Sequence, residues 1–246
     1  MTSPDLASLQ DNINRYYPYL LEIRKRLLFV AALFGIASII GFFNYQKITT
    51  FILGFFNLKG VNVVFTSPYQ FFSLSINTGM IVGLAVIFPL LLFQLLAFLK
   101  PALRPREFKL VLVSVPLSVI LFACGFTFGL VVMKYVVVTF YQKAVELQIG
   151  NYLDIELLLS HILITSALMG LAFQFPIVMT FLMHLKIIKQ KMLESQRLLF
   201  YLVTLIFVML LPPTDLMSDA LLFFPLVILF ELTLILNRIV LKTHLL

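Results

Sequence analysis

A lone carboxylate set among bases is the first candidate for chemistry in this sequence. Glu22 lies in LLEIRKRLLF, residues 20–29, beside Arg24, Lys25 and Arg26 at the start of an apolar run. On a helix Glu22 faces Arg26 at i+4, an order that stabilises an exposed helix by about 0.2–0.5 kcal/mol. One hypothesis is therefore an ordinary intrahelical ion pair at the edge of a membrane.

A second carboxylate has the same setting. Glu107 lies in KPALRPREFKL, residues 100–110, among two arginines and two lysines. A carboxylate can accept two parallel hydrogen bonds from a guanidinium group, which a lysine cannot donate. The other hypothesis is that Glu22 and Glu107 occupy shallow clefts between helix ends and bind arginines of an incoming chain.

A third acid, Glu231, lies well inside an apolar segment, where an ionised carboxylate is costly. Three explanations are open: the acid is protonated, it pairs with a polar group such as Gln174, or a partner helix supplies a donor. We hypothesise that Gln174 and Glu231 form a polar patch that docks the span of a partner protein.

The composition defines the class of protein that must position these residues. The 246 residues are 61% hydrophobic and 12% charged, with a formal net charge of +7. A soluble domain of this size cannot bury so much apolar surface, so the sequence predicts a polytopic membrane protein. The bases lie in short clusters between apolar runs, which argues against nucleic-acid binding. Cys124, the one cysteine, lies in an apolar run and is expected to be a packing residue.

Six apolar segments predict an all-α membrane protein of six transmembrane helices in a single domain, residues 1–246. A span needs about 20 residues to cross a hydrocarbon core of about 30 Å. The fifth segment has 14 residues and the tight turn PPTD joins it to the sixth, so the last two spans are expected to be short. The segments are residues 27–43, 71–99, 110–133, 157–185, 198–211 and 216–236.

The distribution of lysine and arginine predicts the orientation. With six spans both termini lie on one side, and that side carries 14 of the 18 bases. The positive-inside rule therefore places both termini in the cytoplasm. About 26 mostly polar residues precede the first apolar run, so we expect a retained anchor rather than a cleaved signal peptide.

The sequence has none of the common catalytic or metal-binding motifs. It contains no HExxH, GxSxG or Walker A loop and no cysteine–histidine cluster with metal-ligand spacing. The three histidines, His161, His184 and His244, are far apart in sequence and are expected to be interfacial polar residues. We therefore predict a protein that is not an enzyme and holds no metal or cofactor.

Six stretches of the sequence carry recognisable motifs: LLEIRKRLL at 20–28, TSPYQFF at 66–72, QLLAFLKPALRPREFKL at 94–110, LAFQFPIVM at 171–179, LLPPTD at 210–215 and LLFFPLVILFEL at 221–232. In this order they together resemble the TatC family, the multispanning core subunit of the twin-arginine protein translocase. The sequence departs from the family pattern at several points: Tyr19 replaces a histidine, Gln70 and Gln174 replace acids, and the turn TPPD has become PPTD.

The resemblance implies a receptor for signal peptides with paired arginines. Such a receptor serves the export of folded proteins, driven by the proton gradient. By resemblance, Glu22 and Glu107 read the two arginines, Arg24 and Arg26 complete the signature, and Phe98 packs the apolar part of the signal peptide. The implied protein is a multi-pass protein of the bacterial cytoplasmic membrane, or of an organellar equivalent.

The resemblance also implies partners: TatA-like and TatB-like single-span proteins, precursor proteins, and further copies of the chain within a larger complex. Met209 and Leu210 match positions where the family docks its small partners, and Gln174 and Glu231 are the polar candidates for the same role. In the outer turn, Asp215 and Asp219 are expected either to cap the sixth helix or to contact a partner.

Two other functions are weighed from the residues alone. A secondary transporter or channel for a small solute would use Glu231, Gln174 and Asn77 as its pathway, which requires a continuous polar stripe through several spans. A membrane-embedded enzyme would require a nucleophile paired with a base, and the sequence offers no such pair.

Overall fold

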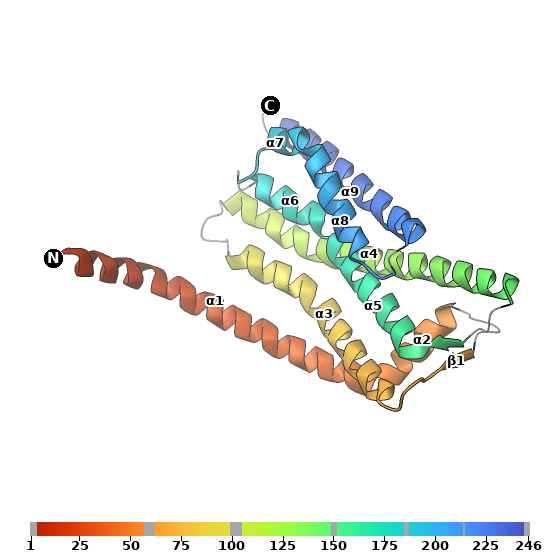
Figure 1. Cartoon of the computed structure of the whole chain (residues 1–246). Helices are drawn as coiled ribbons and strands as arrows, with labels where there is room; N and C mark the ends of the chain where they lie inside the picture. Colours follow the sequence, from red (N-terminus) through yellow and green to blue (C-terminus); the bar gives the residue numbers. More distant parts are fainter. Residues whose placement is uncertain are drawn as a thin grey trace.

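The computed structural model describes residues 4–56, 62–98, 105–148, 152–184, 187–213 and 215–243, and within these ranges the side chains of residues 17, 21–56, 64–94, 115–148, 153–183, 187–213 and 215–239. Helices dominate the described residues, and one short pair of strands joins two loops (Figure 1). The elements are α1 Pro4–Phe43, α2 Tyr45–Phe56, β1 Asn62–Val64, α3 Gln70–Phe98, α4 Pro105–Glu146, β2 Tyr152–Asp154, α5 Ile155–Ala172, α6 Phe175–His184, α7 Gln190–Ser195, α8 Arg197–Met209 and α9 Leu216–Thr243.

Helices α1 and α3 pack closely because glycines on α3 remove the side chains between them. A Cβ atom on Gly79 would lie 2.7 Å from the carbonyl oxygen of Ser38, and one on Gly83 would lie 3.0 Å from the ring of Phe34. In a membrane, where lipid competes with apolar side chains, such small residues let two backbones approach and gain dispersion contacts. The contact fixes α3 against the N-terminal helix.

Helices α4 and α5 form the second close pair. A Cβ atom on Gly129 of α4 would lie 2.6 Å from the Cα atom of Ser166 on α5. Helix α4 is 42 residues long, far longer than the predicted segment 110–133, and it continues through Pro116. At about 1.5 Å per residue it is about 63 Å long, so it extends well beyond a hydrocarbon core of about 30 Å.

The predicted fourth segment, 157–185, is divided into α5 and α6. Helix α5 ends at Ala172, and α6 begins at Phe175 with Pro176 as its second residue. A proline has no N–H to donate, and its ring clashes with the carbonyl group four residues earlier, which here belongs to Ala172. The break places Gln174 between the two helices, at a point where its side chain leaves the regular helix surface.

The last two apolar helices differ in length. Helix α8 has 13 residues, which confirms a short fifth segment. Helix α9 has 28 residues and continues past the predicted end at residue 236, so the expectation of a short span was wrong for the sixth segment. Within the part of the chain that the structure describes, five helical regions are long and apolar enough to cross a membrane, and α8 adds a shorter sixth.

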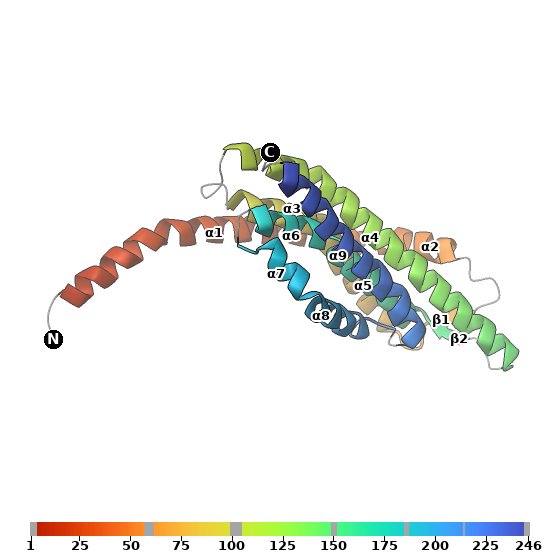
Figure 2. The same cartoon turned by 90° about the horizontal axis from the view of Figure 1, so that it is seen from above.

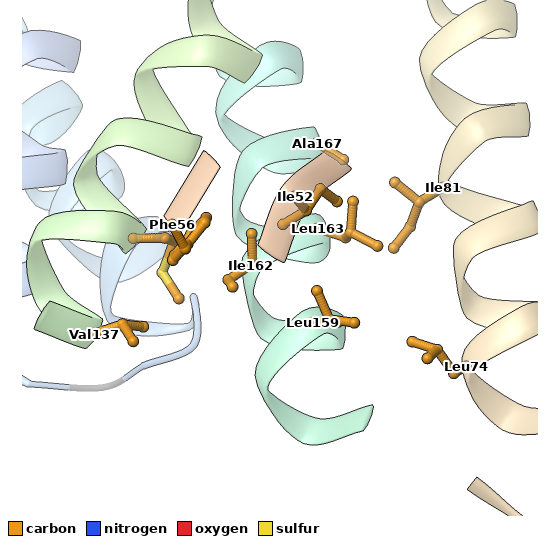
Figure 3. Packing of buried hydrophobic residues seen from close by; sticks show 10 residues of the cluster. Ile52, Phe56, Leu74, Ile81, Val137, Leu159, Ile162, Leu163 and Ala167 are labelled. Carbon is orange, nitrogen blue, oxygen red and sulfur yellow. The ribbon is translucent and has the colours of Figure 1, made fainter. Parts of the chain in front are cut away.

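The loops of one end contain structure that hydropathy did not predict. Helix α2 follows α1 directly and buries Ile52 and Phe56 in the main apolar core, with residues of α3, α4 and α5 (Figure 3). Strands β1 and β2 pair in parallel, with Val63 opposite Leu153. These elements tie the loop after α1 to the loop before α5.

The start of α1 and the end of α9 lie at the same side of the helix bundle (Figure 1). The end of α3, the start of α4 and the end of α6 lie at that end, and β1 and β2 lie at the opposite end (Figures 1 and 2). The arrangement agrees with an even number of crossings, and the cytoplasmic assignment of the termini remains a prediction from the bases.

Candidate functional site

The carboxylate of Glu22 is held in place by Arg26. The Nε and Nη2 atoms of Arg26 donate to Oε1 of Glu22 at 3.2 and 2.6 Å. The Nη1 atom of the same arginine donates to the backbone carbonyl and to the side-chain oxygen of Gln94 on α3, at 3.0 and 3.1 Å. The predicted ion pair between Glu22 and Arg26 is therefore confirmed, and it also links α1 to α3.

The Glu22 side chain remains accessible while it is oriented. It is 45% exposed, against 27% for Arg26. Among the described side chains, the hydrogen bonds of Arg26 use only Oε1, which leaves Oε2 for a further donor. A carboxylate has about four lone-pair sites, so Glu22 can accept an incoming guanidinium without losing Arg26.

The other predicted signal-peptide residues lie at the same end. Arg24 is exposed on α1. Phe98 is the last residue of α3 and Glu107 is in the first turn of α4, but both side chains lie outside the described residues. Arg26, one turn after Glu22, is bonded to Gln94 near the end of α3, and the start of α4, which carries Glu107, lies at the same end of the bundle (Figure 1).

Gln174 is fully buried and has its own partner on α4. Its Nε2 donates to the backbone carbonyl of Ser118 at 2.9 Å, and the Ser118 hydroxyl donates to its Oε1 at 2.8 Å. Both side chains are about 98–99% buried. The amide group therefore satisfies a carbonyl that an ionised acid at this position would repel, which explains why glutamine fits where the family pattern has an acid.

Glu231 bonds to α8 rather than to Gln174. Its Oε1 accepts from the Tyr201 hydroxyl at 2.5 Å, and its Oε2 lies 3.4 Å from Nη1 of Arg197. The hypothesis that Gln174 and Glu231 form one polar patch was wrong, because each residue is engaged with a different helix. Tyr201, which the sequence did not suggest, lies one helical turn after Arg197 on the same face of α8.

The solute-pathway hypothesis fails on the same geometry. Asn77 donates to the hydroxyl group of Ser160 at 3.2 Å, so it belongs to the contact between α3 and α5. Asn77, Gln174 and Glu231 therefore lie in three separate helix contacts. Among the described side chains they do not form the continuous polar stripe that this transport mechanism requires.

A dense polar cluster surrounds Asp154, at the end of the bundle opposite to Glu22. Its Oδ2 accepts from the Thr66 hydroxyl and from Nε2 of Gln70, each at 2.5 Å. Its Oδ1 accepts from the backbone N–H groups of Glu156 and Leu157 at 3.0 and 3.1 Å, which caps α5. The Thr66 hydroxyl, followed by the backbone N–H groups and Gln70, holds the pKa of Asp154 below its ordinary value.

Gln70 has a clear role in that cluster. Its amide nitrogen donates to Asp154, and its Oε1 accepts from the backbone N–H of Thr66 at 2.8 Å. The acid of the family pattern would place a second negative charge against Asp154 and would lose this donor. The sequence signal for Asp154 was available, since an acid before an apolar helical run is a typical N-cap.

The two acids at the turn between α8 and α9 have different surroundings. Asp215 accepts from the backbone N–H of Ser218 at 3.0 Å, so the prediction that it caps α9 is confirmed. Asp219 is not a cap: its Oδ1 is buried without a hydrogen-bond partner among the described residues. The nearby Met209 and Leu210 are 50% and 77% exposed, which suits a surface that meets lipid or another helix.

The described residues contain no group of three or more histidine, cysteine or acidic side chains that could hold a metal ion. The features that remain are an oriented carboxylate at the end with both termini, a clamped loop cluster at the other end and a short exposed helix α8. They define a polytopic membrane protein with an accessible, oriented carboxylate at one end of its helix bundle.

The family model "Sec-independent protein translocase protein (TatC)" matches residues 18–225, and this chain belongs to that family. It is 29% identical to the Bacillus subtilis protein TatCy over 89% of this chain and 87% of that protein. It is 31% identical to the TatC of Rothia mucilaginosa over 86% of this chain and 75% of that protein.

The fold agrees with the family. A crystal structure of the twin-arginine translocase receptor TatC in DDM superimposes with a TM-score of 0.77 at 27% identity, and covers 89% of this chain and 99% of that one. The apolar helices and the bacterial relatives indicate a multi-pass integral protein of the inner membrane. The members of this family are components of a protein translocase, which is a transport system.

Proposed function

We propose that this chain is the receptor subunit that binds twin-arginine signal peptides, and that Glu22 and Glu107 bind the two guanidinium groups. The observation that supports the proposal most directly is the state of Glu22, which is exposed, ionisable and oriented by an arginine that is itself anchored on α3. A guanidinium keeps its charge at every physiological pH and matches the fork of a carboxylate, whereas a lysine offers a single point charge.

Arg26 has a defined part in this proposal. Its bonds to Gln94 keep it in place when a ligand approaches, so it holds the Glu22 carboxylate rather than competing for both oxygens. Preorganisation of this kind lowers the entropy cost of binding. Phe98, at the end of α3 on the same side, is the proposed contact for the apolar part of the signal peptide.

A cross-linking experiment tests the proposal. A photo-reactive amino acid placed next to Glu107 is exposed to a precursor with paired arginines and then to the same precursor with paired lysines. We expect a cross-link with the arginine precursor that is lost with the lysine precursor and with Glu107→Gln. The matched control is Glu194→Gln, an acid in α7 near the same end of the bundle, which should leave the cross-link intact.

Equal cross-linking of both precursors, or none in the parent protein, would return Glu22 and Glu107 to ordinary interfacial ion pairs. A loss caused equally by Glu194→Gln would also contradict the proposal, because it would show a general effect of negative charge at this end. Export of a folded precursor in membranes that carry Glu107→Gln provides the second readout, and we expect it to be abolished.

Fewer residues are proposed to contact partner proteins than the sequence suggested. Single-span TatA-like and TatB-like proteins are proposed to dock on the exposed apolar face at the end of α8, which includes Met209 and the C-cap residue Leu210. Gln174 is unsuited to this role because it is buried and paired with Ser118. Glu231 stays a candidate through its 29% exposed side chain, although Tyr201 and Arg197 already satisfy it.

A further inference from the structure

Helix α2 lies where the hydropathy pattern predicted only a loop between the first two spans. Its buried side chains Ile52 and Phe56 share one apolar cluster with Leu74 of α3 and Leu159 of α5 (Figure 3). Leu74 and Leu159 each lie in the second turn of their helix, so α2 lies alongside the ends of these helices and not beyond them. Its depth is therefore that of the spans, although its 12 residues are too few to cross a membrane.

Lysine side chains lie at both ends of α2. The helix runs across the bundle from the end of α1 towards α4, where Nζ of Lys134 donates to the backbone carbonyl oxygen of Phe55 at 2.7 Å (Figure 1). The same Nζ atom lies 4.5 Å from the centre of the Phe55 ring. At the other end, Lys47 is exposed in the first turn of α2. A charged amine is costly in the hydrocarbon core, so the two lysines favour a depth near the lipid headgroups for the whole helix.

The outward face of α2 is aromatic and carries little charge. Phe51 is 70% exposed, and Phe55 follows it four residues later on the same face. Lys47 precedes Phe51 by four residues, and the sequence of α2 contains no acidic residue. Aromatic rings beside a lysine on a short helix are typical of helices that lie in the membrane interface.

The aromatic face of α2 continues into the ends of α1 and α3. Ring contacts join these elements, since the centroids of Phe42 and Phe72 are 6.1 Å apart and those of Tyr45 and Phe71 are 5.1 Å apart. The exposed rings of this region are called the aromatic band. Each member is at least half exposed, and the band consists of Phe43, Phe51, Phe65, Tyr69, Phe71 and Phe72.

We propose that the aromatic band anchors this end of the protein in the headgroup layer of the lipid leaflet opposite to the termini. The band is continuous with a lipid-facing surface, because Ile36, Ile40 and Phe43 follow one exposed face of the first span. Aromatic rings favour the boundary between lipid and water, and phenylalanine and tyrosine fill this role in a chain without tryptophan. Helix α2 is thus an element that lies in the membrane interface.

The arrangement of the band favours lipid over water and over a protein partner. In water, six exposed rings would form an apolar surface of a kind that soluble proteins rarely present. The rings come from three separate segments, and lipid contacts all of them without a complementary shape. Phe65 and Tyr69 flank the loop whose Thr66 and Gln70 bond to Asp154, so the anchor also holds this loop at the membrane surface.

Because the sequence has no tryptophan, introduced tryptophans report depth directly. The full-length variants Phe51→Trp and Phe72→Trp are each reconstituted into lipid vesicles. Fluorescence quenching is measured with phospholipids brominated near the headgroup, with phospholipids brominated near the chain ends, and with acrylamide in the water. We expect both tryptophans to be quenched at least about twofold more by the shallow bromines than by the deep ones.

Two control variants calibrate the measurement at other depths. Ala32→Trp is exposed near the middle of the first span and should be quenched more by the deep bromines. Leu147→Trp follows the end of α4, about 20 Å beyond Lys134 along the helix. Leu147 is exposed, so its tryptophan should be quenched by acrylamide and by neither lipid.

Two results would overturn the proposal. If acrylamide quenches Phe51→Trp and Phe72→Trp as strongly as Leu147→Trp, the aromatic band faces water. If all three quenchers leave both tryptophans unaffected, another copy of the chain covers the band. The vesicles contain no precursor protein, so this measurement and the test of the receptor function can fail independently.

Discussion

Glu22 and Asp154 are carboxylates at opposite ends of the bundle, and their surroundings differ in kind. The described donors to Glu22 come from one side chain and reach one oxygen, whereas Asp154 accepts four hydrogen bonds shared between both oxygens. The Asp154 cluster joins the loop before α3 to the start of α5. The difference separates the carboxylate proposed to bind a peptide, which has an oxygen left for a further donor, from one whose hydrogen bonds hold the fold together.

This contrast predicts two kinds of variant. Changes at the Asp154 end should lower stability and leave peptide affinity unchanged. Changes at Glu22 should lower peptide affinity and leave stability unchanged. The contact between α1 and α3 should affect both stability and peptide affinity. It packs two helices together, and it carries Gln94, which anchors the Arg26 that orients Glu22.

The largest effect is expected where both properties depend on one contact. Gly79→Leu would force a side chain against the carbonyl oxygen of Ser38, 2.7 Å from the Cβ position, and would separate α1 from α3. We expect a loss of about 3 kcal/mol in the free energy of unfolding, from overpacking, together with loss of peptide binding. Thermal unfolding in detergent and a peptide-binding assay measure the two effects.

Gly35→Leu is the control for that variant, because nothing lies within 4 Å of its Cβ position on the same helix pair. It should keep the melting temperature and the peptide affinity of the parent. A normal melting temperature for Gly79→Leu would show that the close approach of α1 and α3 is not needed for stability.

Asp154→Ala should have the next largest effect, and this effect should be on stability alone. It removes the N-cap of α5 and the acceptor for Thr66 and Gln70. Loss of a cap costs about 1 kcal/mol, and hydrogen bonds to a charged group add about 1.5–3 kcal/mol, so we expect a total of about 2–4 kcal/mol. Thermal unfolding measures it, with Glu146→Ala, an exposed acid at the end of α4, as the control.

Glu22→Gln should show the reverse behaviour. The amide oxygen can still accept from Arg26, so the melting temperature should change little. The affinity for a twin-arginine peptide should fall about tenfold or more, because a charge-assisted pair becomes a neutral hydrogen bond. Peptide titration by fluorescence measures the affinity. A drop in melting temperature as large as that of Asp154→Ala would remove the distinction between the two ends.

Asp154 should also make stability depend on pH, and this effect should be smaller than those above. Its pKa in the folded protein lies below the ordinary value of 3.8, so its contribution is complete above that pH and is lost as the pH falls through the lowered pKa. The difference in melting temperature between the parent protein and Asp154→Asn should therefore be constant near neutral pH and shrink below about pH 4. A difference that grows on acidification would contradict this sign.

Glu231→Gln should have the smallest effect. Its pairing with Arg197 is partly exposed and spans 3.4 Å, and the bond from Tyr201 survives in the amide. The amide therefore loses only the long contact with Arg197, so thermal unfolding should barely change. Tyr201→Phe should cost more, since it leaves the carboxylate oxygen without its short hydrogen bond. An effect of Glu231→Gln above that of Asp154→Ala would make the α8–α9 contact the principal polar clamp.

Several features were predictable from the sequence because they depend on local composition. Hydropathy identified the apolar segments and their order, since each span must be a long run of apolar residues whatever its neighbours are. The i+4 spacing predicted the pair of Glu22 and Arg26, and the motifs in chain order predicted the family. The turn after α8 and the cap at Asp215 also follow from residues close together in sequence.

Only the tertiary structure decided which distant residues meet. Arg26 and Gln94, Gln174 and Ser118, and Glu231 and Tyr201 are 68, 56 and 30 residues apart. No periodicity specifies such pairs, because they depend on helix crossings that glycine contacts and the break before Pro176 determine. The prediction that Gln174 pairs with Glu231 was wrong for this reason. Both are polar residues in apolar segments, but Gln174 contacts α4 and Glu231 contacts α8.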